Sequence, residues 1–348
     1  MTVNFKFGIL LVVASVMLGA IKPKMESEPT AIKTKLSEYS FFAGNISDLK
    51  PAFNVFPYEV NAALFSDYAE KARFIYLPDG QKMEYDPKQS FAFPTGAVII
   101  KNFFYWNDVR SLEKGRRILE TRLLVREAMG WKALEYIWNT EQTEAFLEVT
   151  GATMPVSWLD ENGKKQTIDY IAPNLNQCKG CHSFDGQFIP IGITARQLNR
   201  TENNENQLIA WQKAGRLLLP ENFDLSIAPK LVEYTHSDQQ LTSLRARSYL
   251  DANCAHCHNP HGPASTSGMF LEVDQTDLEK LGVNKPPVAA GRGSGNRRFG
   301  IVPGKPNESI LVFRMESDDP GIRMPELGRQ LAHQEGLELV KEWIREMK

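Results

Sequence analysis

Residues 245–258 read RARSYLDANCAHCH, a stretch that joins a segment with helical spacing directly to a Cys-x-x-Cys-His motif. A second motif of the same form, CKGCH, occupies residues 178–182. Together the two motifs contain all four cysteines of the 348-residue chain. Random placement of so few cysteines and histidines would give even one such motif only about once in two thousand chains. The motifs are therefore a functional signal.

The spacing within each motif suits one cofactor. Two thiols three residues apart on a helical turn can reach the two vinyl groups of a haem and form thioethers, and the next histidine then comes under the iron. Such a histidine normally donates its other ring N–H to a carbonyl, which the loop with Pro260 and Pro263 could supply for the second motif. The sequence thus predicts two haem c groups, attached at Cys178, Cys181, Cys254 and Cys257, with His182 and His258 as proximal iron ligands.

Other uses of paired cysteines fit less well. Two pairs that hold structural zinc are usually about 15–20 residues apart, whereas 72 residues lie between Cys181 and Cys254. A thioredoxin-like thiol pair needs only one motif, inside a β-α-β pattern. Neither that pair nor ordinary disulfides explain the histidine after each pair. Haem c accounts for all of these residues.

The N-terminal segment is expected to direct export to the periplasm. After Lys6, residues 7–20 read FGILLVVASVMLGA, with Leu18 and Ala20 at the −3 and −1 positions of a cleavage site. The alternative is an uncleaved membrane anchor, because Ile21 extends the apolar run. Beyond it, no stretch approaches the roughly 18 apolar residues of a membrane span. The formal net charge of −2 does not indicate the excess of basic residues that nucleic-acid-binding proteins usually have.

We expect residues 1–20 to be a signal peptide, residues 21–40 a polar linker and residues 41–170 a β-rich domain. In the last of these, short apolar or aromatic runs alternate with turn signals, as in a small antiparallel sheet or sandwich. The expected strands lie at residues 97–100 with 103–106, 118–125, 133–138 and 145–149. This domain carries no catalytic motif, and its aromatic residues are expected to fill its core.

The rest of the chain is expected to be a mainly α-helical dihaem region of cytochrome c type, which makes the fold class α+β. The first haem segment is assigned to residues 171–240, with a helix at 206–219, and the second haem domain to residues 241–348. Helical spacing from Ala246 to Asn253 leads into the second motif, and another apolar stripe runs from Leu337 to Met347. A helix before the motif and a C-terminal helix are the arrangement of class I cytochromes c.

Met324 is the predicted distal ligand of the second haem. It stands in the RMP loop between the second motif and the C-terminal stripe, where a thioether could reach the open face of the haem. Met315 and Met269 are the alternatives. A thioether ligand raises the reduction potential, and axial ligands span about 0.8 V in all.

The first haem has no comparable ligand, since no methionine lies between His182 and Cys254. Three possibilities stay open: His236, the only histidine in that interval; Met154, from the β-rich domain; and an iron with an open position. Elsewhere, Arg297 and Arg298 end a glycine-rich stretch that either is a flexible loop or pairs with haem propionates.

The C-terminal part resembles the planctomycete-type cytochrome c domain through NCAHCH, SGMFLEV, VPGKPNESIL, RMP and a final helix with KEWI. The chain after the signal segment also resembles a family of bacterial dihaem c-type proteins of unassigned physiological role, through QCKGCH, IPIGITARQLNR and RARSYLDANCAHCH. The resemblance implies the attachment cysteines and proximal histidines given above, with Met324 as a distal ligand. It implies no substrate.

Three functions are consistent with two haems. The favoured one is a non-catalytic electron carrier, or the electron-transfer subunit of a periplasmic dehydrogenase system, that meets a redox partner protein. The second is a dihaem enzyme such as a peroxidase, with an open iron at the first haem. The third is a haem-containing sensor or binding protein whose β-rich domain binds a partner.

Overall fold

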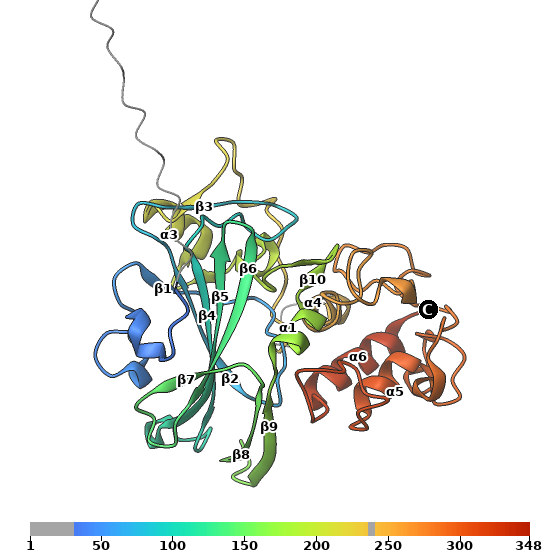
Figure 1. The fold of residues 1–348 in the computed structure, drawn as a ribbon. Coiled ribbons are helices and arrows are strands. Elements are labelled where there is room, and N and C mark those ends of the chain that lie inside the picture. Colours follow the sequence, from blue (N-terminus) through green and yellow to red (C-terminus); the bar gives the residue numbers. More distant parts are fainter. Residues whose placement is uncertain (1–30, 236–240) are drawn as a thin grey trace, which may run out of the picture.

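One antiparallel sheet dominates the fold. The computed structural model describes residues 31–235 and 241–348, so the expected signal peptide lies outside the described residues. Six strands form the sheet in the order β1-β2-β4-β5-β6-β7, each antiparallel to its neighbour (Figure 1). Their bounds are Val55–Pro57 (β1), Glu70–Tyr76 (β2), Val98–Trp106 (β4), Arg116–Glu127 (β5), Gly130–Trp138 (β6) and Ala145–Glu148 (β7). The β-rich prediction is confirmed.

Shorter strands pair outside this sheet. β8 (Ala152–Leu159) and β9 (Lys165–Ala172) form an antiparallel hairpin that contacts β4. β3 (Met83–Glu84) pairs in parallel with β14 (Leu217–Leu218). The remaining two hairpins are β10 (Ser183–Phe184) with β11 (Gln187–Phe188), and β12 (Thr201–Glu202) with β13 (Glu205–Asn206).

One face of the sheet is covered by the segment that precedes it in the chain. Leu36, in the short 3₁₀ helix Leu36–Tyr39, is only 1% exposed and packs in the core that contains Phe74 and Ile100. The predicted linker therefore does not extend to residue 40, because its last residues form part of this core.

The opposite face carries a charged row between two apolar patches. Arg73, Lys101, Arg122 and Glu135 stand directly opposite one another on the four neighbouring strands β2, β4, β5 and β6. The hairpin β8–β9 packs on one side of this charged row, and residues 193–217 pack on the other. Like charges directly opposite each other destabilise a sheet unless other groups compensate them, and here Glu59 pairs with Arg73 (3.3 Å) and Glu120 pairs with Arg122.

Residues of the segment 171–240, which the sequence assigns to the first haem, share a core with the β-rich domain. Ile193 and Trp211 are buried in the same cluster as Ile75 and Ile99 of the sheet. The expected boundary at residue 170 thus does not separate two cores. The helix expected at residues 206–219 is also too long, because the chain turns at Gly215 (φ 70°) and then pairs with β3.

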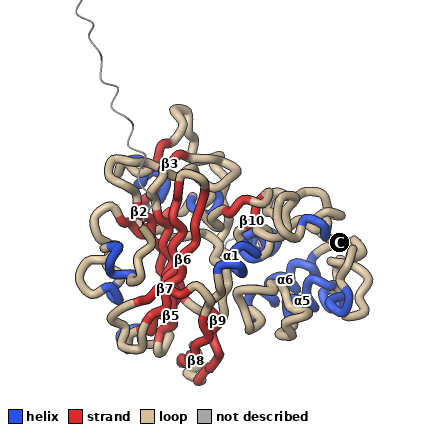
Figure 2. Tube along the Cα trace, in the orientation of Figure 1, coloured by secondary structure: helices blue, strands red, loops and turns tan. Residues whose placement is uncertain are grey.

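The described residues contain six short α-helices joined by long loops (Figure 2). α4 and α6 lie where the helical spacing predicts them. The mainly helical character expected for this region is not shown, because loops occupy much of it. The helix bounds are Leu175–Cys181 (α1), Ala195–Leu198 (α2), Gln207–Lys213 (α3), Thr242–Asn253 (α4), Ile310–Glu316 (α5) and Gln334–Glu346 (α6).

The last three helices form a second core beside the sheet (Figure 1). Tyr249 and Leu250 of α4 pack there with Leu337 and Val340 of α6. Across residues 31–235 and 241–348, no helix is both long enough and apolar enough to cross a membrane.

The crossing of α4 and α6 depends on Gly336. A Cβ at this position would overlap the ring of Tyr249, which is 4% exposed. Gly336→Ala is therefore expected to destabilise the protein by about 1–3 kcal/mol. At an exposed position inside a helix, the same substitution usually stabilises a protein by up to about 1 kcal/mol. Urea unfolding measures the difference. Glu342→Ala, at an exposed position of α6, is the control, and a Gly336→Ala protein at least as stable as the parent would refute this packing.

Candidate functional site

The first Cys-x-x-Cys-His motif forms the end of α1. A capping box starts this helix: the Asn174 side chain accepts from the backbone N–H of Gln177 (3.0 Å), and the Gln177 side chain accepts from the backbone N–H of Asn174 (2.9 Å). The helix then places Cys178 and Cys181 one turn apart, and His182 follows as its C-cap. Because β9 ends just before the cap, the hairpin fixes where α1 begins.

The second motif follows α4 without a break. The backbone N–H of Cys254 donates to Leu250 O (2.9 Å), and that of His258 donates to Cys254 O (2.9 Å), so the motif continues as a helical turn. An ion pair between Asp251 of α4 and Arg196 of α2 (2.9 Å) joins these two helices. Both motifs thus have their thiols on one turn, as haem attachment requires.

Each motif histidine is held by a backbone carbonyl. His182 Nδ1 donates to Ile189 O (2.7 Å), and its ring stacks on Phe188 at 4.9 Å between centroids. His258 Nδ1 donates to Met269 O (3.3 Å), and not to the loop with Pro260 and Pro263 as the sequence suggested. In both cases the remaining nitrogen, Nε2, is available to a metal ion, and the ring is oriented as metal-ligating imidazoles usually are.

A cavity of ≈ 640 Å³ adjoins the second motif. Cys254, Cys257 and His258 line it from one side. Met324 and Met315 also line it, as does Met269, so the predicted ligand and both alternatives border the same space. The volume falls within the range of about 300–1,000 Å³ typical of cofactor sites.

Arg314 is a lining residue that sequence reasoning missed. It lies on α5, its Nε donates to Ile322 O (2.8 Å), and the residue borders the cavity. Arg297 and Arg298, the expected partners of haem propionates, are not among the lining residues. Instead their guanidinium groups lie over the rings of Phe313 (4.2 Å) and Phe299 (5.5 Å). Only the fold brings α5 over the second motif, so no local pattern identified Arg314.

The two motifs meet each other. The side-chain ligand atoms of Cys181, His256 and Cys257 all lie within 4.8 Å of one another. The Cys257 sulfur lies 3.8 Å from Gly180 O, and Gly180 and Cys181 of the first motif also line the cavity beside the second. Figure 1 shows α1 between the sheet and the C-terminal helices, where this contact is made.

The thiols differ in acidity. The hydrogen bond with Cys257 lowers the pKa of Cys181 to about 5 and raises the pKa of Cys257 well above its usual range. Burial raises the pKa of Cys178 to about 11 and that of Cys254 to about 12. Because their ligand atoms lie so close together, Cys181 and Cys257 as free thiols could hold a thiophilic metal ion such as zinc together with His256.

The first motif faces the charged row of the sheet, since α1 and β11 contact β6. Burial, followed by the charge of Lys101, lowers the pKa of His182 to about 3. Lys101 Nζ donates to Ile191 O (3.2 Å), and burial lowers its pKa to about 7. Arg122 is paired with Glu120, but in the described part of the chain no carboxylate lies within ion-pair distance of Lys101.

Of the two side chains considered as ligands for an iron at the first motif, the structure places Met154. His236 lies outside the described residues. Met154 is on β8 and packs against the apolar cluster under the hairpin, with Tyr170 as its partner across the strands.

Comparison with protein-family models, with curated proteins and with solved structures finds no match to this chain. The candidate site therefore rests on the two motifs and their geometry.

Proposed function

We propose that this chain is an exported electron-transfer protein that carries two haem c groups, with residues 171–348 as a dihaem region of cytochrome c type. The observation that supports it most is the cavity that Cys254, Cys257 and His258 border together with Met324. Two thiols, an imidazole and a thioether around one space are the complete set of groups that a six-coordinate haem c needs.

Each of the residues at the cavity would have a separate role. Haem, when bound, supplies an iron that changes by one electron between its ferric and ferrous states. His258 would hold the iron through Nε2, with the Met269 carbonyl fixing the plane of the ring. Met324, which lines the same cavity, would be the second protein ligand of the iron and would exclude an exogenous ligand. Arg314 would balance the charge of a propionate with a charge-assisted hydrogen bond.

The first motif would attach its haem on the other side of the contact between the motifs. Cys178 and Cys181 would form the thioethers, and His182 would hold the iron. Burial lowers the pKa of Lys101 to about 7, and a neighbouring propionate would favour its charged form. A propionate there would give Lys101 an anionic partner, as Glu59 and Glu120 do for Arg73 and Arg122.

Contact between the motifs favours transfer of an electron from one haem to the other. Each haem would be bonded to one of the two neighbouring thiols, Cys181 and Cys257. Because the rate of electron transfer falls steeply with distance, adjoining haem edges allow rapid exchange within one chain. We therefore favour an electron carrier in the periplasm, where a redox partner protein supplies or accepts the electron.

The test is an absorption spectrum, oxidised and reduced, of protein exported together with cytochrome c maturation enzymes. Two low-spin haems per chain are the expected result. One high-spin haem would exclude the simple carrier and favour the peroxidase-like alternative, which peroxide turnover would then test.

A metal site is the second candidate, favoured by the cluster of Cys181, His256 and Cys257. Zinc bound there would use one thiol of each motif and so prevent haem attachment at both. Elemental analysis of the purified protein separates the two proposals, since one predicts two irons per chain and the other one zinc without iron.

A further inference from the structure

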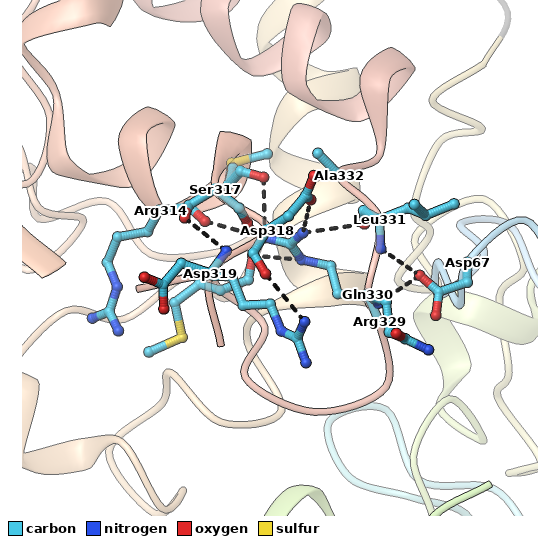
Figure 3. A network of polar contacts seen from close by, with 12 residues as sticks. Asp67, Arg314, Ser317, Asp318, Asp319, Arg329, Gln330, Leu331 and Ala332 are labelled. Atoms are coloured by element: carbon cyan, nitrogen blue, oxygen red, sulfur yellow. Dashed lines mark hydrogen bonds and ion pairs between the residues drawn. The ribbon is translucent and has the colours of Figure 1, made fainter. Parts of the chain in front are cut away.

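Arg329 is buried beneath the loop that carries Met324. Its side chain is only 3% exposed, and the guanidinium is the centre of a polar network (Figure 3). It donates hydrogen bonds of 2.8–3.1 Å to five backbone carbonyls, those of Arg314, Met315, Ser317, Met324 and Leu331. One side chain thus joins the end of α5 to the loop at residues 324–331.

Both backbone polar groups of Met324 take part in this network. Its N–H donates to Arg314 O (2.9 Å), and its carbonyl accepts from Nε (3.1 Å) and from a terminal nitrogen (2.8 Å) of Arg329. The backbone from which the thioether extends is therefore fixed on both sides of the Cα atom. Only the side-chain torsions of Met324 are left free.

The β-rich domain holds the other end of the loop through Asp67. Asp67 Oδ1 accepts from the backbone N–H groups of Gln330 (2.6 Å) and Leu331 (2.8 Å), as Figure 3 shows. Asp67 is itself 4% exposed, and the hydroxyl of Tyr105 in β4 donates to its carbonyl (2.6 Å). Its backbone is left-handed (φ 51°), a conformation that a non-glycine residue keeps only when its surroundings impose it.

The same segment of the β-rich domain reaches the attachment side of the cavity. The backbone N–H of Phe65 donates to the side chain of Asn253 (2.7 Å), the residue directly before Cys254. The Phe65 ring also stacks on His333, at 4.2 Å between centroids. Residues 65–67 thus contact both the residue before Cys254 and the loop that follows Met324.

We propose that Arg329 and Asp67 are positioning residues that hold Met324 on the iron of the second haem, so that the β-rich domain sets the ligation of that haem. This inference rests on the proposed function. A methionine thioether is a weak iron ligand, and a loop that is held in place in advance loses little entropy when it binds. Release of the loop would favour detachment of the thioether and lower the reduction potential.

Asp67→Ala tests the proposal in the full-length exported protein. Loss of two hydrogen bonds is expected to shift the ligation equilibrium about tenfold toward the detached thioether. The ferric absorption band of methionine-ligated haem should weaken, and the potential of the second haem should fall. Asp67→Asn keeps an acceptor oxygen, so it should retain most of both signals. Haem content should remain at two per chain in each variant.

Arg329→Gln should weaken the methionine absorption band and lower the potential of the second haem more than Asp67→Ala does, because five carbonyls lose their donor. The matched control is Asp318→Ala, which removes an exposed carboxylate 3.7 Å from the same guanidinium and should leave both signals unchanged.

An unchanged methionine band and potential in Asp67→Ala, or equal losses in Asp67→Ala and Asp67→Asn, would overturn the positioning role. Backbone amide exchange gives a measurement that does not depend on haem. Asp67→Ala should speed amide exchange at Gln330 and Leu331 relative to the parent protein. If exchange rises in this way but the parent protein carries no covalent haem, the result would contradict the proposed function and leave the loop contact intact.

Discussion

Replacement of both Cys254 and Cys257 by alanine is expected to lower the covalently bound haem from two groups per chain to one. These thiols lie at the end of α4 and border the cavity with His258, so without them the second haem has no covalent link. The haem that remains should lack the methionine ligation assigned to Met324. Acid extraction followed by a haem assay measures the covalent content, and the absorption spectrum identifies the haem that is left.

The matched variant replaces Cys178 and Cys181. It should also leave one haem, but the methionine-ligated one, because the cavity beside the second motif keeps its lining cysteines, histidine and methionine. The two variants should thus have the same haem content, but only the Cys178 and Cys181 variant should show the spectrum of the haem that Met324 ligates. Unchanged haem content in either variant would contradict the assignment of that motif. Loss of one zinc in both variants would instead support the shared site at Cys181, His256 and Cys257.

The second large effect is expected from Met324→Ala, which should lower the reduction potential of the second haem on the order of 0.1 V. The thioether stabilises the ferrous state, and its loss leaves the position to water or to a stronger donor. A potentiometric titration followed by absorption measures the change. The first haem should keep its potential, apart from a small change caused by its neighbour.

Met315→Ala and Met269→Ala are the controls for this assignment, since both side chains border the same cavity. Met315 is 7% exposed and belongs to the core of α5 and α6, so its replacement should reduce stability more than potential. A potential that falls with Met315→Ala or Met269→Ala and stays constant with Met324→Ala would reassign the distal ligand.

The sequence predicted those parts of the fold that depend on local patterns. Short apolar or aromatic runs between turn signals marked the strands from β4 to β7, and helical spacing marked α4 as the helix that enters Cys254. The motif cysteines and histidines were identified because their spacing is specific. Each of these signals lies within a short stretch of the chain, where the residues adjacent in sequence determine the local structure.

Contacts between distant segments could not be predicted in this way. The charged row exists only because register places Arg73, Lys101 and Arg122 side by side on neighbouring strands. The carbonyl that orients His258 comes from Met269, and Asp67 reaches Leu331 across 264 positions of sequence. No local pattern encodes such partners. The same reason explains why the helix expected at residues 206–219 was too long: Leu217 pairs with Met83 of another segment.

The intact mass of the exported protein, measured under denaturing conditions, tests the central claim most directly. The account predicts the polypeptide mass plus two haem groups, because thioether bonds survive denaturation. A polypeptide mass without added haem, from cells that attach haem to a control cytochrome c, would contradict it.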